Sequence, residues 1–294
     1  MSAQRDKTIG ATTQLASQAS INFGSSIAGL LIPVVGSVVV VAVRQLVTAL
    51  VLVPIVRPSL RGRTLKSLWP VIALGVILAG MNLSFYEAVG RVGLGIAVTI
   101  EFLGPLAIAL IASRRWLDVV CALAAGLGVY LLAGSDGNLD VVGVILALVA
   151  GAGWAAYILL ARTVAHRFAG LDGLSLASIV AVVMILPWAI IAIDFSTIDW
   201  GVLGLLIATG VLCSAIPYSL DSFVLRRITP RLYSIVTSCA PVIAALLGWL
   251  ILQQVLSLQQ ILAIVLVSVA AATAFATAKE RTVSEIEGTA TITP

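Results

Sequence analysis

The sequence has little charge and almost no material for a metal or disulfide site. Only 10% of its 294 residues are charged, whereas 61% are hydrophobic, and the mean hydropathy is +1.15. Soluble domains are about 25% charged, so this chain cannot cover a water-facing surface, which excludes a soluble enzyme and a disordered protein. The chain has one His and three Cys, and the cysteines lie in apolar stretches without disulfide or metal-ligand spacing. We therefore expect no disulfide scaffold, no metal and no cofactor.

Long hydrophobic runs take the place of these features. A helix that crosses the ~30 Å hydrocarbon core of a bilayer needs roughly 20 mostly apolar residues, and a helix also keeps its backbone hydrogen bonds internal, as lipid requires. The sequence therefore predicts an all-α integral membrane protein with ten transmembrane helices, at 15–34, 36–56, 68–88, 93–113, 117–134, 141–162, 174–193, 201–221, 231–252 and 257–277.

The positions of the basic residues predict the orientation of these helices. All but two of the 17 Lys and Arg residues fall before the first span, after the last, or in every second loop between them. The exceptions are Arg44, which lies inside a span, and Arg91, which faces the opposite side. Because basic residues concentrate on the cytoplasmic side, we expect both termini to be cytoplasmic.

Five spans per half is an odd number, so a duplicated half would enter the membrane upside down. A weak trace of such a duplication exists, since residues 99–110 can be laid over 235–246 with Pro105 opposite Pro241. Matched breaks of this kind are typical of secondary transporters, although Pro is common in transmembrane helices in any case. The predicted organisation is a cytoplasmic segment at 1–14, five-helix repeats at 15–134 and 141–277, and a cytoplasmic polar tail at 278–294.

Arg44 and Glu101 are the charged residues that need an explanation, because a charge inside the membrane is costly. Each lies about eight residues from the outer end of its span, which is ~12 Å of depth at 1.5 Å per residue. They form either a structural ion pair or the two poles of a site for a zwitterion. In the second case Arg44 would bind a carboxylate, and Glu101 would bind an ammonium group or carry a proton.

Other polar and aromatic residues are candidates for the lining of the same site. They are Asn82 and Tyr86 on the third span, Trp154 and Tyr157 on the sixth, Tyr218 on the eighth and, more weakly, Asn22 on the first. Helix packing alone also explains the aromatic residues. Pro105 and Pro241 are candidate bends, and Pro105 would leave the carbonyl of Glu101 without its helical hydrogen bond. Glu87 and Arg91 have the spacing of an i,i+4 ion pair near the outer surface.

Several segments resemble the EamA-type branch of the drug/metabolite transporter superfamily. The resembling segments are Gly80-Met-Asn-Leu-Ser-Phe-Tyr86, Gly93-Leu-Gly-Ile-Ala-Val-Thr-Ile-Glu-Phe-Leu-Gly-Pro-Leu-Ala107, Ser113-Arg-Arg115, Gly151-Ala-Gly-Trp-Ala-Ala-Tyr-Ile158 and Ile216-Pro-Tyr-Ser-Leu220. The resemblance covers about residues 20 to 277. It implies a 5+5 inverted repeat in the bacterial inner membrane. One departure is Gln253-Gln254, where many relatives carry Gly-Glu.

The resemblance also implies a function, namely secondary-active export of amino acids such as threonine or homoserine, or of related small metabolites, by alternating access. The expected partners are a small-molecule substrate, the lipid bilayer and, if transport is coupled to them, protons, with no nucleic acid. Export of another metabolite or of a hydrophobic drug is the alternative. A channel is less favoured because the sequence has no ring of like charges, and an intramembrane enzyme is less favoured because it has no catalytic cluster.

Overall fold

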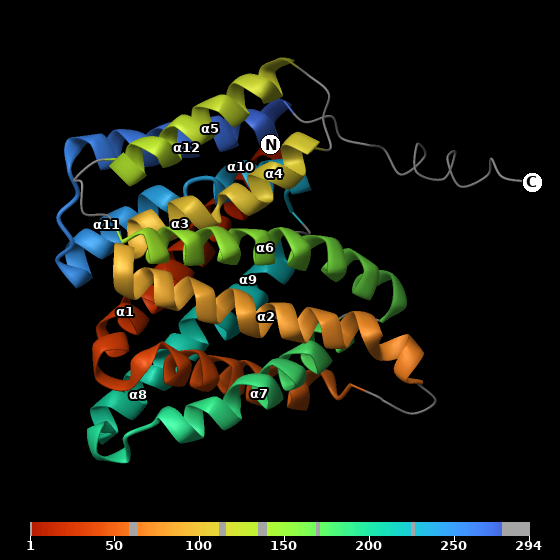
Figure 1. Cartoon of the computed structure of the whole chain (residues 1–294). Helices are drawn as coiled ribbons and strands as arrows, with labels where there is room; N and C mark the ends of the chain where they lie inside the picture. Colours follow the sequence, from red (N-terminus) through yellow and green to blue (C-terminus); the bar gives the residue numbers. More distant parts are fainter. Residues whose placement is uncertain are drawn as a thin grey trace, which may run out of the picture.

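The computed structural model describes residues 2–58, 64–111, 116–134, 140–168, 171–224 and 227–277, and within these ranges every regular element is helical (Figure 1). The elements are α1 (Ser2–Val56), α2 (Leu65–Val92), α3 (Leu94–Glu101), α4 (Leu103–Ile111), α5 (Trp116–Gly134), α6 (Val141–Arg167), α7 (Asp172–Ala192), η1 (Phe195–Thr197), α8 (Trp200–Gly210), the π-helical η2 (Val211–Ala215), α9 (Ile216–Val224), α10 (Pro230–Thr237), α11 (Ala240–Leu252) and α12 (Leu258–Thr277). This confirms the all-α prediction.

Seven helical segments of the described chain are long and apolar enough to cross a membrane, and two further apolar helices, Trp116–Leu132 and Trp200–Ala215, are shorter. The first of the seven covers 53 residues, which would be about 80 Å long as a straight helix at 1.5 Å per residue. The fold is therefore that of a multi-pass membrane protein. The number of ten crossings stays a prediction.

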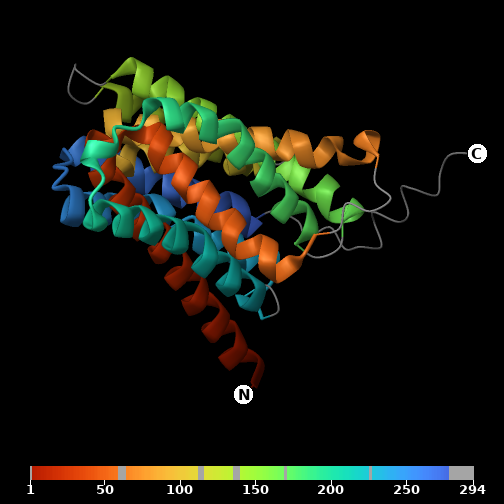
Figure 2. The ribbon, with the colours of Figure 1, turned by 90° about the horizontal axis from the view of Figure 1, so that it is seen from below.

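The helix α1 is longer than one membrane span because it consists of two helical parts with a sharp change of direction between them (Figure 1). Gly36 has φ +79° and ψ 155°, a backbone conformation that residues with a Cβ rarely adopt. The sequence predicts a boundary between two spans at this same place, between residues 34 and 36. α1 therefore consists of two helical arms joined at Gly36, and the first turns of its first arm extend away from the bundle (Figure 2).

Two other apolar segments are interrupted near their middles. α3 and α4 are separated by Phe102, and α10 and α11 by Ser238 and Cys239. Each break begins three residues before one of the two prolines that the sequence pairs, Pro105 and Pro241. A proline removes one helical hydrogen bond, so both segments are weakened where they turn.

The helix α1 contacts most of the other helices. α1 contacts α7 and α8 as well as η2, α9 and α10, while α2 packs mainly against α6 and α7, and α5 against α12. Small residues allow the closest approaches: a Cβ on Gly104 of α4 would lie 2.0 Å from the carbonyl oxygen of Gly151 on α6. Such backbone contact between helices is common in membranes.

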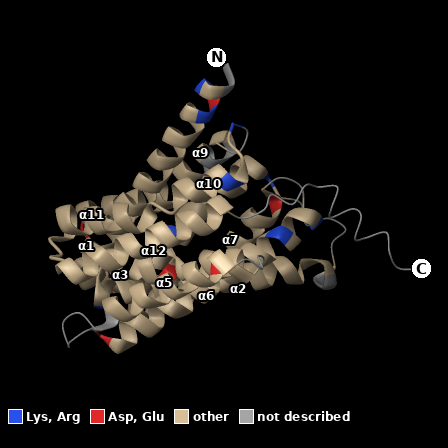
Figure 3. Cartoon of the chain, turned by 90° about the horizontal axis from the view of Figure 1, so that it is seen from above, with Lys and Arg blue, Asp and Glu red and all other residues tan. Residues whose placement is uncertain are grey.

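The two ends of the bundle differ in charge (Figure 3). We call one the basic end, because Arg57, Arg167 and Arg231 lie at the helix termini there. The other, toward the left of Figure 1, is the acidic end, where Asp140, Asp194 and Asp199 cap α6, η1 and α8 through backbone N–H groups. Arg91, at the end of α2, also lies at the acidic end, as the sequence predicts.

Candidate functional site

A cavity of about 590 Å³ lies between α1, α2, the broken segments α3–α4 and α10–α11, α6, η2 and α12. Small-molecule sites in proteins typically enclose 300–1,000 Å³. One part of its wall is polar and comes mainly from α1 and α2: Gln18, Asn22, Ser25, Arg44, Gln45 and Asn82. Another part is aromatic and includes Phe102, Trp154, Tyr157 and Phe275. The cavity can therefore hold a small solute that has both polar and apolar parts.

Most of the candidate residues from the sequence meet at this cavity. Its wall includes Arg44, Asn82, Glu101, Pro105, Trp154 and Tyr157, together with the weaker candidate Asn22. Tyr86 instead lies behind the wall and is fully buried. Pro241 is buried at the start of α11, away from the lining. The backbone of Tyr218 belongs to α9, but its side chain lies outside the described part of the structure. That these residues bind substrate stays a prediction.

Arg44 is held in place by two side chains of α2. Its Nη1 donates hydrogen bonds to Oδ1 of Asn82 and, at 3.3 Å, to the hydroxyl of Tyr86. Asn82 is itself oriented, because its Nδ2 donates to the carbonyl oxygen of Leu78 at 2.7 Å. The guanidinium carbon also lies 5.6 Å from the centre of the Tyr86 ring, within cation–π range. Arg44 is thus oriented by side chains of α2.

Tyr86 connects Arg44 to both the first arm of α1 and the π-helical segment. Its hydroxyl lies 3.4 Å from Oγ of Ser25 and 3.8 Å from Sγ of Cys213 in η2. π-helical segments inside α-helices are frequently found at functional sites. The tyrosine is therefore a positioning residue behind the cavity wall, rather than part of the wall as its spacing with Asn82 suggests.

Glu101 is the last residue of α3 and lines the cavity where α3 ends. Because Pro105 has no N–H, the carbonyl of Glu101 lacks its usual helical partner. This carbonyl faces α6, since a Cβ added to Gly151 would lie 2.9 Å from its oxygen. Next to Glu101, the ring of Phe102 packs edge-on against Trp154, with centroids 5.7 Å apart. The carboxylate is therefore bordered by an aromatic wall.

Gln18, which lines the cavity beside the candidate Asn22, was missed from the sequence, although a signal for it exists. Gln14, Gln18 and Asn22 follow one another at intervals of four, which places them on one face of a helix. Gln18 and Asn22 line the cavity, and Nε2 of Gln14 donates to Oγ1 of Thr237 in α10 at 3.0 Å. The polar lining on η2 and α10, such as Ser214 and Ser234, follows from how the helices are placed and has no such spacing.

Apolar helices around a cavity that contains both an arginine and a glutamate fit a multi-pass membrane transporter. The comparisons with known proteins give the family. The model of the EamA-like transporter family matches residues 141–276. The threonine/homoserine exporters RhtA of Escherichia coli (strain K12) and Salmonella typhimurium (strain LT2) are each 36% identical to this chain over 253 residues, which are 85% of this chain and 85% of theirs.

The chain belongs to the EamA-like transporter family, within the drug/metabolite transporter superfamily, as the resemblance of its segments predicts. A solved protein structure has the same fold, with a TM-score of 0.62 at 19% identity over 94% of this chain and 99% of that one. The RhtA relatives are threonine/homoserine exporters, and this chain is accordingly a membrane exporter.

Proposed function

We propose that this protein is a secondary-active exporter of amino acids, of the threonine and homoserine type, in the inner membrane of a bacterium. The observation that carries the proposal is the cavity, in which an arginine and a glutamate line one enclosed space. A free amino acid carries one charge of each sign. Arg44 would bind its carboxylate, for which a guanidinium fork is well suited, and Glu101 would bind its ammonium group or exchange it for a proton.

The proposed topology has ten crossings in two inverted halves, 15–134 and 141–277, with both termini cytoplasmic. Three features support it. Gly36 divides α1 into two arms, the breaks at Phe102 and Ser238 occupy equivalent places in the sequence pairing, and arginines gather at the basic end. The basic end is then cytoplasmic. Single cysteines at Thr64 and at Ser196, in a chain without its native cysteines, should react with an impermeant thiol reagent from opposite sides of the membrane.

The proposed mechanism is alternating access, in which the two halves rock about the cavity and bend at Pro105 and Pro241. The lining supports it, because the cavity extends far toward the basic end. Ala109 and Phe275 lie two residues before the ends of α4 and α12, and Arg162 lies in the last two turns of α6. In this conformation the site would therefore receive substrate from the cytoplasm.

Cells that lack their own amino-acid exporters and are loaded with one amino acid at a time, supplied as dipeptides, test the substrate class. We expect expression of this protein to raise the efflux of threonine and homoserine several-fold over cells with an empty vector. The aromatic wall of Phe102, Trp154 and Phe275 favours a second candidate substrate, a hydrophobic drug. Efflux of hydrophobic cations without any amino-acid efflux would replace the first proposal by the second.

A further inference from the structure

The cavity that is open toward the basic end stops short of the acidic end. Within the broken segment α3–α4 its lining begins at Val98. The residues of α3 before it, Leu94, Ile96 and Ala97, are buried. α3 packs against α11 as well as α2 and α6. It touches α11 through the backbone, since a Cβ on Gly95 would lie 2.8 Å from the Cα of Ala245. A helix of the first predicted half and a helix of the second thus close this end together.

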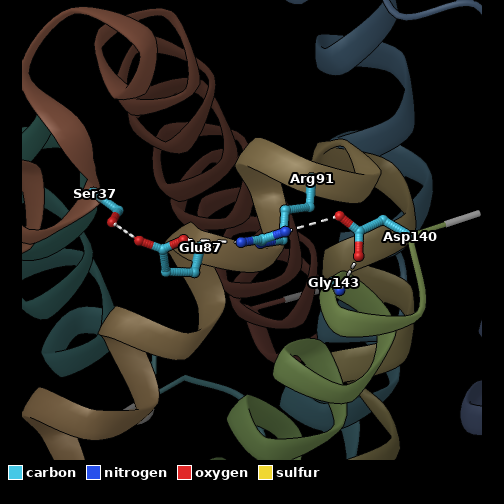
Figure 4. A network of polar contacts seen from close by, with 5 residues as sticks. All are labelled: Ser37, Glu87, Arg91, Asp140 and Gly143. Carbon is cyan, nitrogen blue, oxygen red and sulfur yellow. Dashed lines mark hydrogen bonds and ion pairs between the residues drawn. The ribbon is translucent and has the colours of Figure 1, made fainter.

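An ion pair joins the two halves beside this contact (Figure 4). Nη1 of Arg91, at the end of α2, lies 2.9 Å from Oδ2 of Asp140, immediately before α6. The other carboxylate oxygen of Asp140 accepts the backbone N–H of Gly143 at 3.1 Å, which caps α6. On its far side Arg91 lies 4.0 Å from Glu87, confirming the predicted i,i+4 pair, and Glu87 accepts a hydrogen bond from Ser37, next to the turn of α1. Arg91 is therefore oriented from both sides.

A glutamine makes a second link between the halves. Oε1 of Gln254, just after α11, accepts the backbone N–H of Leu94 at 3.0 Å. This N–H belongs to the first turn of α3 and has no partner within its own helix. Gln254 is held in turn by its own N–H, which donates to the carbonyl of Gly248 at 3.1 Å. Gly93, with φ +86°, provides the room, since a Cβ there would lie 3.0 Å from the Gln254 side chain.

We propose that these two links, Arg91 with Asp140 and Gln254 with the N–H of Leu94, form a latch that holds the acidic end closed while the cavity faces the cytoplasm. The proposal rests on the alternating access proposed above. Opening to the outside separates α3 from α11 and α2 from the start of α6, so both links must break. Both links are weak enough to do so. The side chains of Arg91 and Asp140 are 43% and 34% exposed, and exposed pairs contribute little to stability. The half-buried link from Gln254 is a single hydrogen bond, which contributes about 0.5–1.5 kcal/mol.

A cysteine in place of Met81 provides a reporter, because Met81 lines the cavity from α2 and is half-buried. Replacing Cys121, Cys213 and Cys239 with Ala leaves Met81→Cys as the single thiol. Its labelling by an impermeant reagent, added outside right-side-out vesicles, then measures how often the acidic end opens. We expect slow labelling in this parent chain. Asp140→Asn keeps the cap of α6, since Asn is as good a capping residue as Asp, but loses the ion pair. It should raise the rate about two- to fivefold.

Gln254→Met keeps the length of the side chain but removes the acceptor for Leu94, and it should raise the labelling rate by a similar factor. The two changes together should raise it by about the product of the single factors. The matched control is Asp199→Asn. Asp199 caps α8 at the same end by accepting the N–H of Val202 at 2.7 Å, and its replacement should leave the rate unchanged. Labelling in inside-out vesicles at the parent's rate shows that each variant is folded.

The latch is refuted if the Met81→Cys thiol of the parent reacts as fast from outside as from inside, because the acidic end would then not be closed. It is also refuted if Asp140→Asn and Gln254→Met leave the outside rate unchanged, or if Asp199→Asn raises it equally. None of these measurements uses a substrate. Failure of the latch is therefore distinguishable from failure of the proposed amino-acid export, which the efflux assay detects.

Discussion

Replacing the two opposite charges of the cavity, singly and together, separates a binding role from a structural one. The key variant is Glu101→Gln, which keeps the shape of the side chain at the end of α3 and removes its charge. If Glu101 binds the ammonium group of an amino acid, the chain should reach the membrane in normal amount but lose export.

The size of the loss follows from the surroundings of Glu101. Hydrogen bonds to charged groups contribute about 1.5–3 kcal/mol, and a factor of ten in rate corresponds to about 1.4 kcal/mol. The carboxylate lies in a cavity that opens toward the basic end, so water partly replaces the lost contact. We therefore expect Vmax/KM for threonine to fall about 10- to 100-fold. The assay is efflux from loaded cells, normalised to the amount of protein in the membrane.

The double variant Arg44→Met with Glu101→Gln decides between the two roles. A structural pair that loses one partner leaves a buried charge, which costs about 3–5 kcal/mol in soluble proteins, and removal of both should restore folding and export. A binding site that loses both charges should fold and stay inactive. Asp194→Asn, an exposed cap at the acidic end, is the control and should export normally. An active double variant would refute the binding role. A proton-coupling role further requires that export depends on pH in the wild type but not in Glu101→Gln.

Three further predictions concern single residues. Tyr86→Phe keeps the buried ring but removes the 3.3 Å hydrogen bond to Arg44. A membrane hydrogen bond of about 0.6–1.7 kcal/mol corresponds to about 3- to 20-fold, so KM for threonine should rise by this factor while Vmax stays nearly unchanged in efflux assays. Gln253 has φ +54° at the end of α11, so Gln253→Gly should raise the free energy of unfolding in detergent by up to about 1 kcal/mol; a decrease would contradict the strain at this position. The hydrogen bond from Arg91, with that from the N–H of Gly143, lowers the pKa of Asp140 below its ordinary value of 3.8. Ionised Asp140 therefore stabilises the fold fully above pH 3.8, and this stabilisation is lost as the pH falls through the lowered pKa. The difference in thermal stability between wild type and Asp140→Asn should accordingly be constant from pH 8 to 5 and shrink below about pH 4.

The sequence was sufficient for the class of the fold because the signals for it are local. Long apolar runs, a glycine at the turn of α1 and alternating basic loops each depend only on neighbouring residues. Arg44 and Glu101 could be singled out for the same reason, since an ionisable residue inside a span is rare. The prediction that they lie at equal depth in the membrane needed only the rise per residue of an α-helix.

The partners of these residues could not be predicted, because they depend on how each helix is rotated. Apolar side chains contact the lipid on the outside of the bundle and also fill its core. The sequence of an apolar helix therefore does not indicate which of its faces points inward. Tyr86 is an example. Its spacing from Asn82 places both on one helix face, yet the crossing of α1 over α2 leaves Asn82 in the cavity wall and Tyr86 behind it. The link from Gln254 to Leu94 joins residues 160 positions apart, and nothing in either local sequence indicates it.

The contact between Gly104 and Gly151 has a mechanical consequence. It joins a helix of the first predicted half to one of the second through bare backbone, near the middle of the predicted spans. Such a joint is suited to act as the fulcrum of a lever. At about 15 Å from it, half of the ~30 Å core, a rotation of ~10° displaces a helix end by about 2.6 Å. That movement is enough to separate the 2.9 Å ion pair of Arg91 while the two helices stay in contact at Gly104 and Gly151. A side chain added at either glycine would push the helices apart at this contact.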